Sequence, residues 1–191
     1  MNADIDITGV LLRTERLLIR PWRREDLEDF FAYASVEGVG EAAGWIHHQS
    51  VNETSAVLDR FIENKKTFAL DLGGRVVGSL GIEKYDEARF PAYDSKKCRE
   101  LGFVLAKDQW GRGLMTEAVR EVLRWLFEEK GFDAVFCSHF LDNRRSGALQ
   151  KKCGFVHAAL GRYETKWGEI KEDETNILTR ERYFLLKQTQ N

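Results

Sequence analysis

Residues 100–116 read ELGFVLAKDQWGRGLMT, and this stretch decides how the rest of the chain is interpreted. Its first part is apolar and predicts a short buried strand, and its last part begins a helix. Gly111 and Gly113 lie between the two, in a turn where small residues let a ligand touch the backbone. The amides of Leu114, Met115 and Thr116 are then the unpaired N–H groups of a helix start. The sequence therefore predicts an anion site, and the natural anion is a phosphate.

Two known phosphate-binding motifs do not fit this turn. A P-loop ends in Gly-Lys-Ser/Thr, whereas Gly113 is followed by Leu114. A dinucleotide fingerprint requires a third glycine, where this chain has Thr116. The alternative that Gly111 and Gly113 only form a tight strand-to-helix turn stays open at this point.

The bulk composition indicates one globular domain over residues 1–191, with its core between about residues 14 and 187. The chain is 43% hydrophobic and 12% aromatic, and its net charge of −2 gives no basic excess for nucleic acid. There is no apolar run of the roughly 20 residues that a membrane span needs, and no signal-peptide pattern. Cys98, Cys137 and Cys153 are widely spaced, which predicts a reduced, cytoplasmic protein without a metal site.

Hydrophobic periodicity and turn residues predict the order β-α-α-β-β-β-α-β-α-β-β. The predicted strands cover residues 14–22, 67–72, 76–85, 98–106, 134–140, 155–163 and 176–187, and the predicted helices cover 23–34, 52–64, 115–130 and 143–153. This order predicts an α/β (α+β) fold with a mixed, mostly antiparallel, roughly seven-stranded central sheet flanked by about four helices. The unit from 98 to 140 should be a right-handed parallel strand–helix–strand crossover at its centre.

Two segments carry a family resemblance. WGRGLMTEA at 110–118, after the strand ELGFVL, closely resembles motif A of the GNAT superfamily of acyl-CoA-dependent N-acetyltransferases. DNRRS at 142–146, followed by KCGF at 152–155, resembles the N-x-x-S … G-F segment of the same family. Within the superfamily, these segments look like the Rim-type branch, which contains the ribosomal-protein N-terminal (alanine/serine) acetyltransferases. The resemblance extends from about Thr14 to the C-terminus and implies a GNAT-like fold and acetyl-CoA as co-substrate.

The resemblance also implies where acetyl-CoA binds. The strand backbone would pair with the pantetheine arm, the loop amides would cradle the pyrophosphate, and the start of the last helix would hold the pantetheine amides. The implied contacts are Phe103, Val104, Leu105, Gly111, Arg112, Gly113, Leu114, Met115, Thr116, Asn143 and Ser146. The side chain of Arg112, with Arg144 or Lys152, could reach further phosphates. Trp110 and Met115 depart from the commonest family pattern, but amide contacts do not depend on side chains.

Acetyl transfer to an amine needs a base for the ammonium proton, an oxyanion donor and support for the leaving thiolate. The resemblance makes Glu100 the candidate base, and the alternative is a structural carboxylate at a strand end. Gln150 stands where many relatives carry a tyrosine, so Ser146 is the candidate that supports the thiolate; the alternative is that it only contacts CoA or caps the helix. The oxyanion would bind a backbone N–H of Val104 or Leu105.

The acceptor amine is the least determined part of this interpretation. The candidate acceptor contacts are Trp22, Phe30, Trp45, His47, Tyr85, Phe140 and Tyr163, although most aromatic residues in such a domain belong to the core. The favoured acceptor is a protein N-terminal amine. Acetylation of a small amine, antibiotic or polyamine-like, and a non-catalytic CoA-binding sensor module are the alternatives. Whether the chain forms a homodimer stays open.

Overall fold

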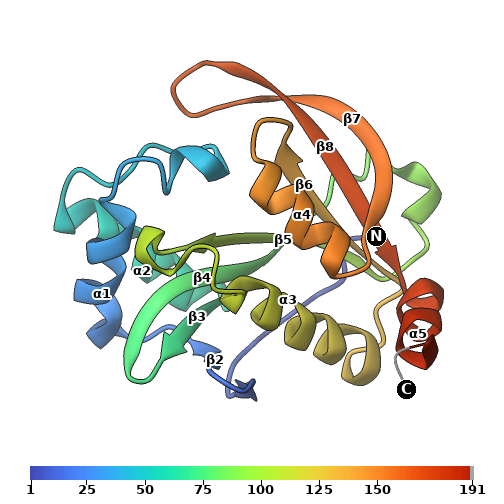
Figure 1. Cartoon of the computed structure of the whole chain (residues 1–191), viewed down its shortest axis with the longest axis horizontal. Coiled ribbons are helices and arrows are strands. Elements are labelled where there is room, and N and C mark those ends of the chain that lie inside the picture. The colour runs from blue at the N-terminus through green and yellow to red at the C-terminus, as the bar shows by residue number, and fades with distance from the viewer. Residues whose placement is uncertain (190–191) are drawn as a thin grey trace.

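A single eight-stranded sheet forms the centre of the computed structural model, which describes residues 1–189 (Figure 1). The strands are β1 (Leu12–Arg13), β2 (Leu18–Pro21), β3 (Thr67–Leu72), β4 (Arg75–Glu83), β5 (Cys98–Leu105), β6 (Ala134–Phe140), β7 (Val156–Glu164) and β8 (Ile170–Thr179). Their order across the sheet is β1-β2-β3-β4-β5-β6-β8-β7. Only β5 and β6 are parallel neighbours, so the predicted mixed, mostly antiparallel sheet with a central parallel crossover is confirmed.

Five α-helices surround the sheet among the described residues. They are α1 (Leu27–Ala34), α2 (Val51–Asn64), α3 (Leu114–Arg124), α4 (Arg144–Lys152) and α5 (Arg180–Thr189). A π-helical turn over Trp125–Glu129 prolongs α3, and Gly131 ends it with a φ of 66°. Ser50 caps α2 by accepting a hydrogen bond from the Glu53 amide at 3.2 Å.

The last predicted strand is wrong over residues 180–187. The strand β8 ends at Thr179, and α5 begins at Arg180. The hydroxyl oxygen of Thr179 accepts a hydrogen bond from the Arg182 amide at 3.3 Å, which is a helix-capping contact. At its other end β8 begins at Ile170, within a segment predicted to be a loop. With the two-residue β1, the sheet has eight strands where about seven were predicted, and α5 is the fifth helix.

The helix α3 contributes the densest part of the core. Ala118, Val119 and Val122 form its apolar stripe and are fully buried against the sheet. Figure 1 shows α3 and α4 next to each other on the viewer's side of the sheet, with α1 at the opposite end of the molecule from α5. The first residues of α3 and α4, which follow β5 and β6 in the sequence, therefore lie beside this parallel pair.

The parallel pairing of β5 and β6 is short. It runs over three residue pairs, from Cys98 with Ala134 to Glu100 with Phe136. Beyond Phe136, β6 pairs only with β8, and beyond Glu100, β5 pairs only with β4. The two central strands therefore diverge after Glu100, and the sheet is open between them.

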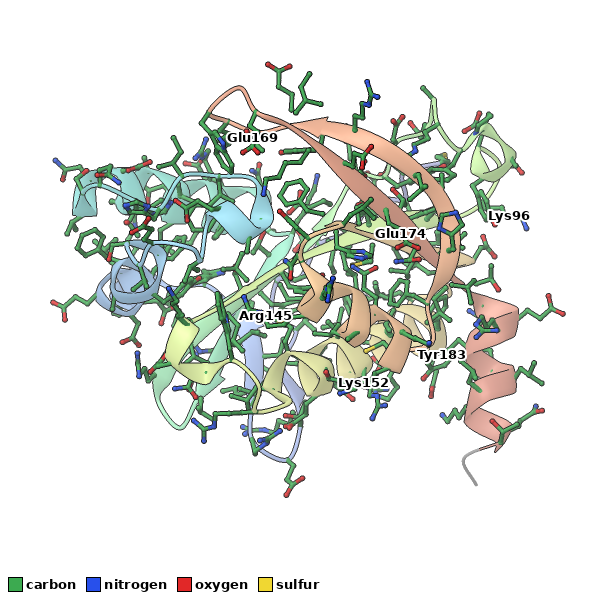
Figure 2. The ribbon with its side chains drawn as sticks, turned by 45° about the horizontal axis from the view of Figure 1, so that its top comes forward. Lys96, Arg145, Lys152, Glu169, Glu174 and Tyr183 are labelled. Atoms are coloured by element: carbon green, nitrogen blue, oxygen red, sulfur yellow. The ribbon has the colours of Figure 1, made fainter. Side chains whose placement is uncertain are left out.

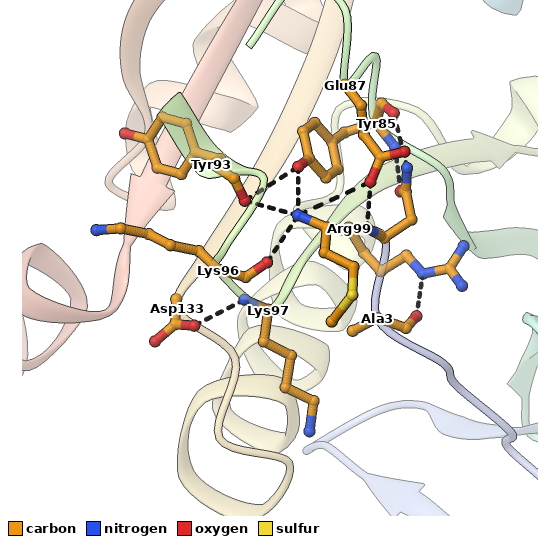
Figure 3. A network of polar contacts seen from close by, with 10 residues as sticks. Ala3, Tyr85, Glu87, Tyr93, Lys96, Lys97, Arg99 and Asp133 are labelled. Atoms are coloured by element: carbon orange, nitrogen blue, oxygen red, sulfur yellow. Dashed lines mark hydrogen bonds and ion pairs between the residues drawn. The ribbon is translucent and has the colours of Figure 1, made fainter. Parts of the chain in front are cut away.

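The closed end of this pair is held by a polar network that Figure 3 shows. The buried guanidinium of Arg99 donates from Nε to the carbonyl of Ala3 at 2.6 Å. The Met1 amine donates to the Tyr85 hydroxyl at 2.7 Å, and Asp133 accepts from the Lys97 amide at 2.7 Å. These contacts fix the start of β5, so the divergence is confined to its other end.

Candidate active site

A cavity of about 520 Å³ occupies the opening between β5 and β6. Its walls come from the whole second half of β5, the glycine turn, the start of α3, the end of β6 and one side of α4. Of the predicted contacts, those that line it are Glu100, Phe103, Val104, Leu105, Gly111, Gly113, Leu114, Met115, Thr116, Asn143 and Ser146. Among the implied acetyl-CoA contacts and the two candidate catalytic residues, Arg112 alone does not line it.

The backbone of β5 presents unused polar groups to this cavity. The Ala106 amide donates to the Val77 carbonyl at 2.7 Å, so the even-numbered residues of β5 turn their peptide groups toward β4. The carbonyl of Val104 confirms this direction, because it lies 2.4 Å from where a Cβ on Gly78 would stand. The peptide groups of Phe103 and the amide of Leu105 therefore face the cavity unpaired, whereas the Leu105 carbonyl accepts a hydrogen bond from Trp110 Nε1 at 2.8 Å. An extended ligand there can pair with β5 as an additional strand.

The glycine turn provides a second set of unpaired amides. Gly111 and Gly113 are exposed and have φ values of 76° and 80°, a conformation that favours glycine. Gly113 is the N-cap of α3, and no side chain caps that helix end. The first N–H groups of α3 are therefore free to bind an anion. Arg16 anchors the turn, donating to the Arg112 carbonyl at 3.0 Å and pairing with Glu117 at 2.7 Å.

The cations beside this turn agree only in part with those predicted, because Lys152 lines the cavity whereas Arg112 and Arg144 do not. The guanidinium of Arg112 lies outside the cavity wall and hydrogen-bonds Gln109, and Arg144 does not line the cavity either. Arg145 and Lys152 do line it, and Figure 2 shows both on α4 at the side of the loop and α3. The guanidinium carbon of Arg145 lies 3.8 Å from the ring centre of Trp110. Trp110 thus holds a cation at the end of the cavity beside the glycine turn.

Carboxylates lie at the opposite end of β5. Glu100 is half-buried, and burial raises the pKa of its carboxyl above the ordinary 4.5. A hydrogen bond from Ser138 lowers that pKa, the charge of Asp173 raises it, and the net shift is upward. Glu83 faces Glu100 across the β4–β5 ladder, and burial also raises the pKa of Glu83. All three carboxylates line the cavity, which suits a cationic or protonatable ligand at this end.

Ser146 lies on α4, which packs beside the end of β6. Asn143 caps the helix, accepting from the Ser146 amide at 3.2 Å, and its own Nδ2 donates to the Ala42 carbonyl at 3.2 Å. The Ser146 hydroxyl receives a hydrogen bond from Gln150 Nε2 at 3.2 Å. The structure therefore brings Glu100 and Ser146, which are 46 residues apart in the sequence, to the wall of one cavity.

Most of the predicted acceptor contacts belong elsewhere. Trp22 and Phe30 are buried in the main core, and Tyr85 stacks on Phe136 at 4.9 Å in a second cluster. Only Phe140 and Tyr163 line the cavity, with ring centres 5.6 Å apart. The sequence interpretation missed Arg145 on α4 and four further wall residues that the register of β4, β6 and β8 brings in: Glu83, Ser138, His139 and Asp173. Their nearness is set by strand pairing, which no local motif records.

The three cysteines are buried and are not candidates for a covalent intermediate. Cys137 is 1% exposed, and burial raises the pKa of its thiol well above the ordinary 9.0. Burial also raises the pKa of Cys153, to about 11. No three His, Cys, Asp or Glu side chains within residues 1–189 are grouped so that they could hold a metal ion. In the same range, the helices are too short or too polar to cross a membrane.

Comparison with known proteins agrees with this geometry. A family profile described as "Acetyltransferase (GNAT) domain" matches residues 16–156. The chain belongs to the GNAT acetyltransferase family, whose members use acetyl-CoA as the acetyl donor. It is 25% identical over 153 residues to the "Uncharacterized N-acetyltransferase YoaA" of Bacillus subtilis, an alignment that covers 76% of this chain and 82% of that protein.

Solved structures share the fold at lower identity. A GNAT-family acetyltransferase from Bacillus anthracis superposes with a TM-score of 0.78 at 19% identity, covering 90% of this chain and 99% of that one. The microcin C7 self-immunity acetyltransferase MccE, solved with acetyl-CoA and AMP, gives 0.76 at 13% identity and covers 92% and 99%. A ribosomal-protein-S5-alanine acetyltransferase from Vibrio fischeri gives 0.71 at 16% identity and covers 92% and 99%.

Proposed function

We propose that this protein moves the acetyl group of acetyl-CoA to a protein N-terminal amine, with Glu100 as the general base. One observation carries the proposal: β5 runs from a half-buried carboxylate at one end to an uncapped helix start at the other, with its backbone open to the cavity between them. Along β5, the cavity thus has a candidate base, then unpaired backbone groups that can bind an extended ligand, and then an anion site.

Each part of acetyl-CoA has a counterpart along the cavity. The amides of Gly113 to Thr116 bind the pyrophosphate, and Arg145 and Lys152 supply positive charge beside it. The pantetheine arm pairs with the peptide groups of Phe103 and with the Leu105 amide, since the Leu105 carbonyl is bound to Trp110. Because the Val104 amide is turned to β4, the oxyanion donor is an amide of Phe103 or Leu105.

The reaction needs no covalent enzyme intermediate. The acceptor nitrogen attacks the thioester carbonyl carbon, and Glu100 takes the proton that this nitrogen loses, directly or through water. The C–S bond then breaks and its electron pair leaves on the CoA sulfur, where the Ser146 hydroxyl stabilises the thiolate by hydrogen bonding. The proton taken up by Glu100 is released to solvent, and solvent supplies the proton that the sulfur gains, which gives an N-acetylated amine and the CoA thiol. The raised pKa of Glu100 suits a base that works near neutral pH.

The acceptor class is inferred from the sequence resemblance and from the charges that line the cavity. The Rim-type character of residues 110–118 and 142–146 favours an α-amine, and a ribosomal-protein-S5-alanine acetyltransferase is among the structural relatives. The carboxylates of Glu83, Glu100 and Asp173 attract the positive charge of any amine before it is deprotonated. A small polyamine-like or antibiotic amine satisfies the same charges and is the second candidate.

An acceptor panel analysed by mass spectrometry separates these candidates. We expect acetylation of peptides with free N-terminal Ala or Ser, and none of the same peptides when the α-amine is blocked and only a lysine amine is free. If only polyamines or aminoglycosides are acetylated, the acceptor is a small amine and not a protein N-terminus. Tight CoA binding without any acetylated product would indicate a CoA-binding sensor module.

A further inference from the structure

Gln150 is a polar side chain buried completely in the last turns of α4. Its exposed fraction is 0%, although it lies next to the cavity wall rather than in it. A buried amide is costly unless its hydrogen-bonding groups are paired. Gln150 is paired on both atoms: Nε2 donates to the Ser138 carbonyl at 3.3 Å and to the Ser146 hydroxyl oxygen at 3.2 Å, and Oε1 accepts from Asn176 Nδ2 at 2.8 Å.

The chemistry of these partners fixes which way the amide points. The Ser138 carbonyl can only accept, so the nitrogen of Gln150 must face it. The second hydrogen of the same NH₂ group is then directed at Ser146, and the Ser146 oxygen acts as an acceptor. This Ser138 carbonyl lies where β6 has left β5, so Gln150 also satisfies a backbone group that the divergence exposes.

The Ser146 hydroxyl oxygen accepts a hydrogen bond from Gln150, so its own O–H hydrogen can be donated to another group. The Ser146 amide is bound to Asn143, and no described protein group accepts from the Ser146 hydroxyl. Because Ser146 lines the cavity, that hydrogen is available to a ligand there. A hydrogen-bonded hydroxyl is also a stronger donor, since linked hydrogen bonds polarise one another.

We propose that Gln150 is a positioning residue that makes the Ser146 hydroxyl a donor to the leaving sulfur of CoA. This inference rests on the proposed function, in which Ser146 stabilises the thiolate as the C–S bond breaks and the electron pair moves to sulfur. Gln150 itself touches no reacting atom. Asn176 on β8 donates a hydrogen bond to Gln150 Oε1 and fixes the orientation of its amide. The direction in which the Ser146 hydroxyl donates is therefore set by three hydrogen-bonded side chains, Asn176, Gln150 and Ser146.

A double-mutant cycle tests the inference. Gln150→Met keeps the length of the side chain and removes the donor, and Ser146→Ala removes the hydroxyl. We expect Gln150→Met to lower kcat about three- to tenfold, as for one lost hydrogen bond, with little change in the KM for acetyl-CoA. In the Ser146→Ala protein the same change should lower kcat by less than about twofold, because Gln150 acts only through Ser146.

The controls separate this inference from the function on which it rests. Lys151→Met, on the exposed side of the same helix turn, should leave kcat unchanged. If Gln150→Met does not accumulate as folded protein, Gln150→Leu, which also lacks the donor, carries the same cycle. Equal losses from Gln150→Met with and without Ser146 would overturn the positioning role and leave acetyl transfer standing. Full activity of Ser146→Ala would overturn it too, whereas a wild-type protein without acetyl transfer would refute the proposed function.

Discussion

Replacement of Glu100 by glutamine is expected to lower kcat about 100-fold or more near pH 7, with a smaller deficit at high pH, where free amine and hydroxide are more abundant. The reason is that glutamine keeps the size and the hydrogen bonding of the side chain but cannot accept the proton. The wild-type kcat/KM should fall as pH drops through the raised pKa of Glu100, and the variant should lack that limb. Initial rates of free-thiol release between pH 5.5 and 9.5 measure both.

The same substitution should not weaken the fold. Burial raises the pKa of Glu100 above 4.5 in the folded state, so between these two pKa values the folded protein binds more protons than the unfolded chain. Ionisation of Glu100 therefore destabilises the folded state as pH rises through this window. Glu100→Gln removes that penalty, and its melting temperature at pH 7 should equal or exceed that of the wild type. A variant that is slow and also less stable would assign Glu100 a structural role.

Glu83→Gln is the matched control for this experiment. Glu83 faces Glu100 in the strand ladder, lines the same cavity and also has a raised pKa, so its replacement removes a similar charge from the same place. We expect a loss of less than about tenfold, from weaker attraction of the acceptor. A larger loss for Glu83→Gln than for Glu100→Gln would transfer the role of base to Glu83.

Replacement of Gly113 by leucine is expected to weaken acetyl-CoA binding about 100-fold. The side chain would stand where the pyrophosphate approaches the first amides of α3, and two lost charge-assisted hydrogen bonds of about 1.5 kcal/mol each correspond to that factor. The left-handed backbone at Gly113 also makes the change costly for folding, by about 1–2 kcal/mol. Isothermal titration with acetyl-CoA and thermal unfolding measure the two effects separately.

Gly9 provides the matched control for the backbone term. Its φ of 71° is close to the 80° of Gly113, and a Cβ at Gly9 would meet no atom within 4 Å. Gly9→Leu should therefore show a similar loss of stability with unchanged acetyl-CoA affinity. If Gly113→Leu also binds acetyl-CoA normally, the two glycines form only a tight turn and the pyrophosphate lies elsewhere.

Much of the fold could be predicted from local sequence because its strongest signals are local. The stripe of α3 is fully buried, as its spacing predicted, and the Gly73–Gly74 turn joins β3 to β4. The error at residues 180–187 has an equally physical origin: Tyr183, Phe184 and Leu185 favour a strand, whereas the Thr179 cap starts a helix. The polar start of β8 looked like a loop because β8 and β7 form a hairpin with largely exposed ends.

The candidate site likewise combines residues that the local sequence predicts with residues that only tertiary packing brings together. The glycine turn and the helix start are contiguous in the sequence, and the structure places them together at the cavity. Glu83 and Asp173 reach the Glu100 end only through the register of β4 and β8, and Arg145 replaces Arg112 because α4 packs against the turn. Such contacts between distant segments depend on tertiary packing, which a single sequence does not encode in any short motif.

The central claim is that the opening between β5 and β6 is where acetyl transfer occurs. A crystal structure of the acetyl-CoA complex tests it most directly. We expect the pyrophosphate on the amides of Gly113 to Thr116, the pantetheine arm along Phe103 and Leu105, and the thioester between Glu100 and Ser146. Acetyl-CoA bound outside this cavity, or with its thioester remote from Glu100, would contradict the account.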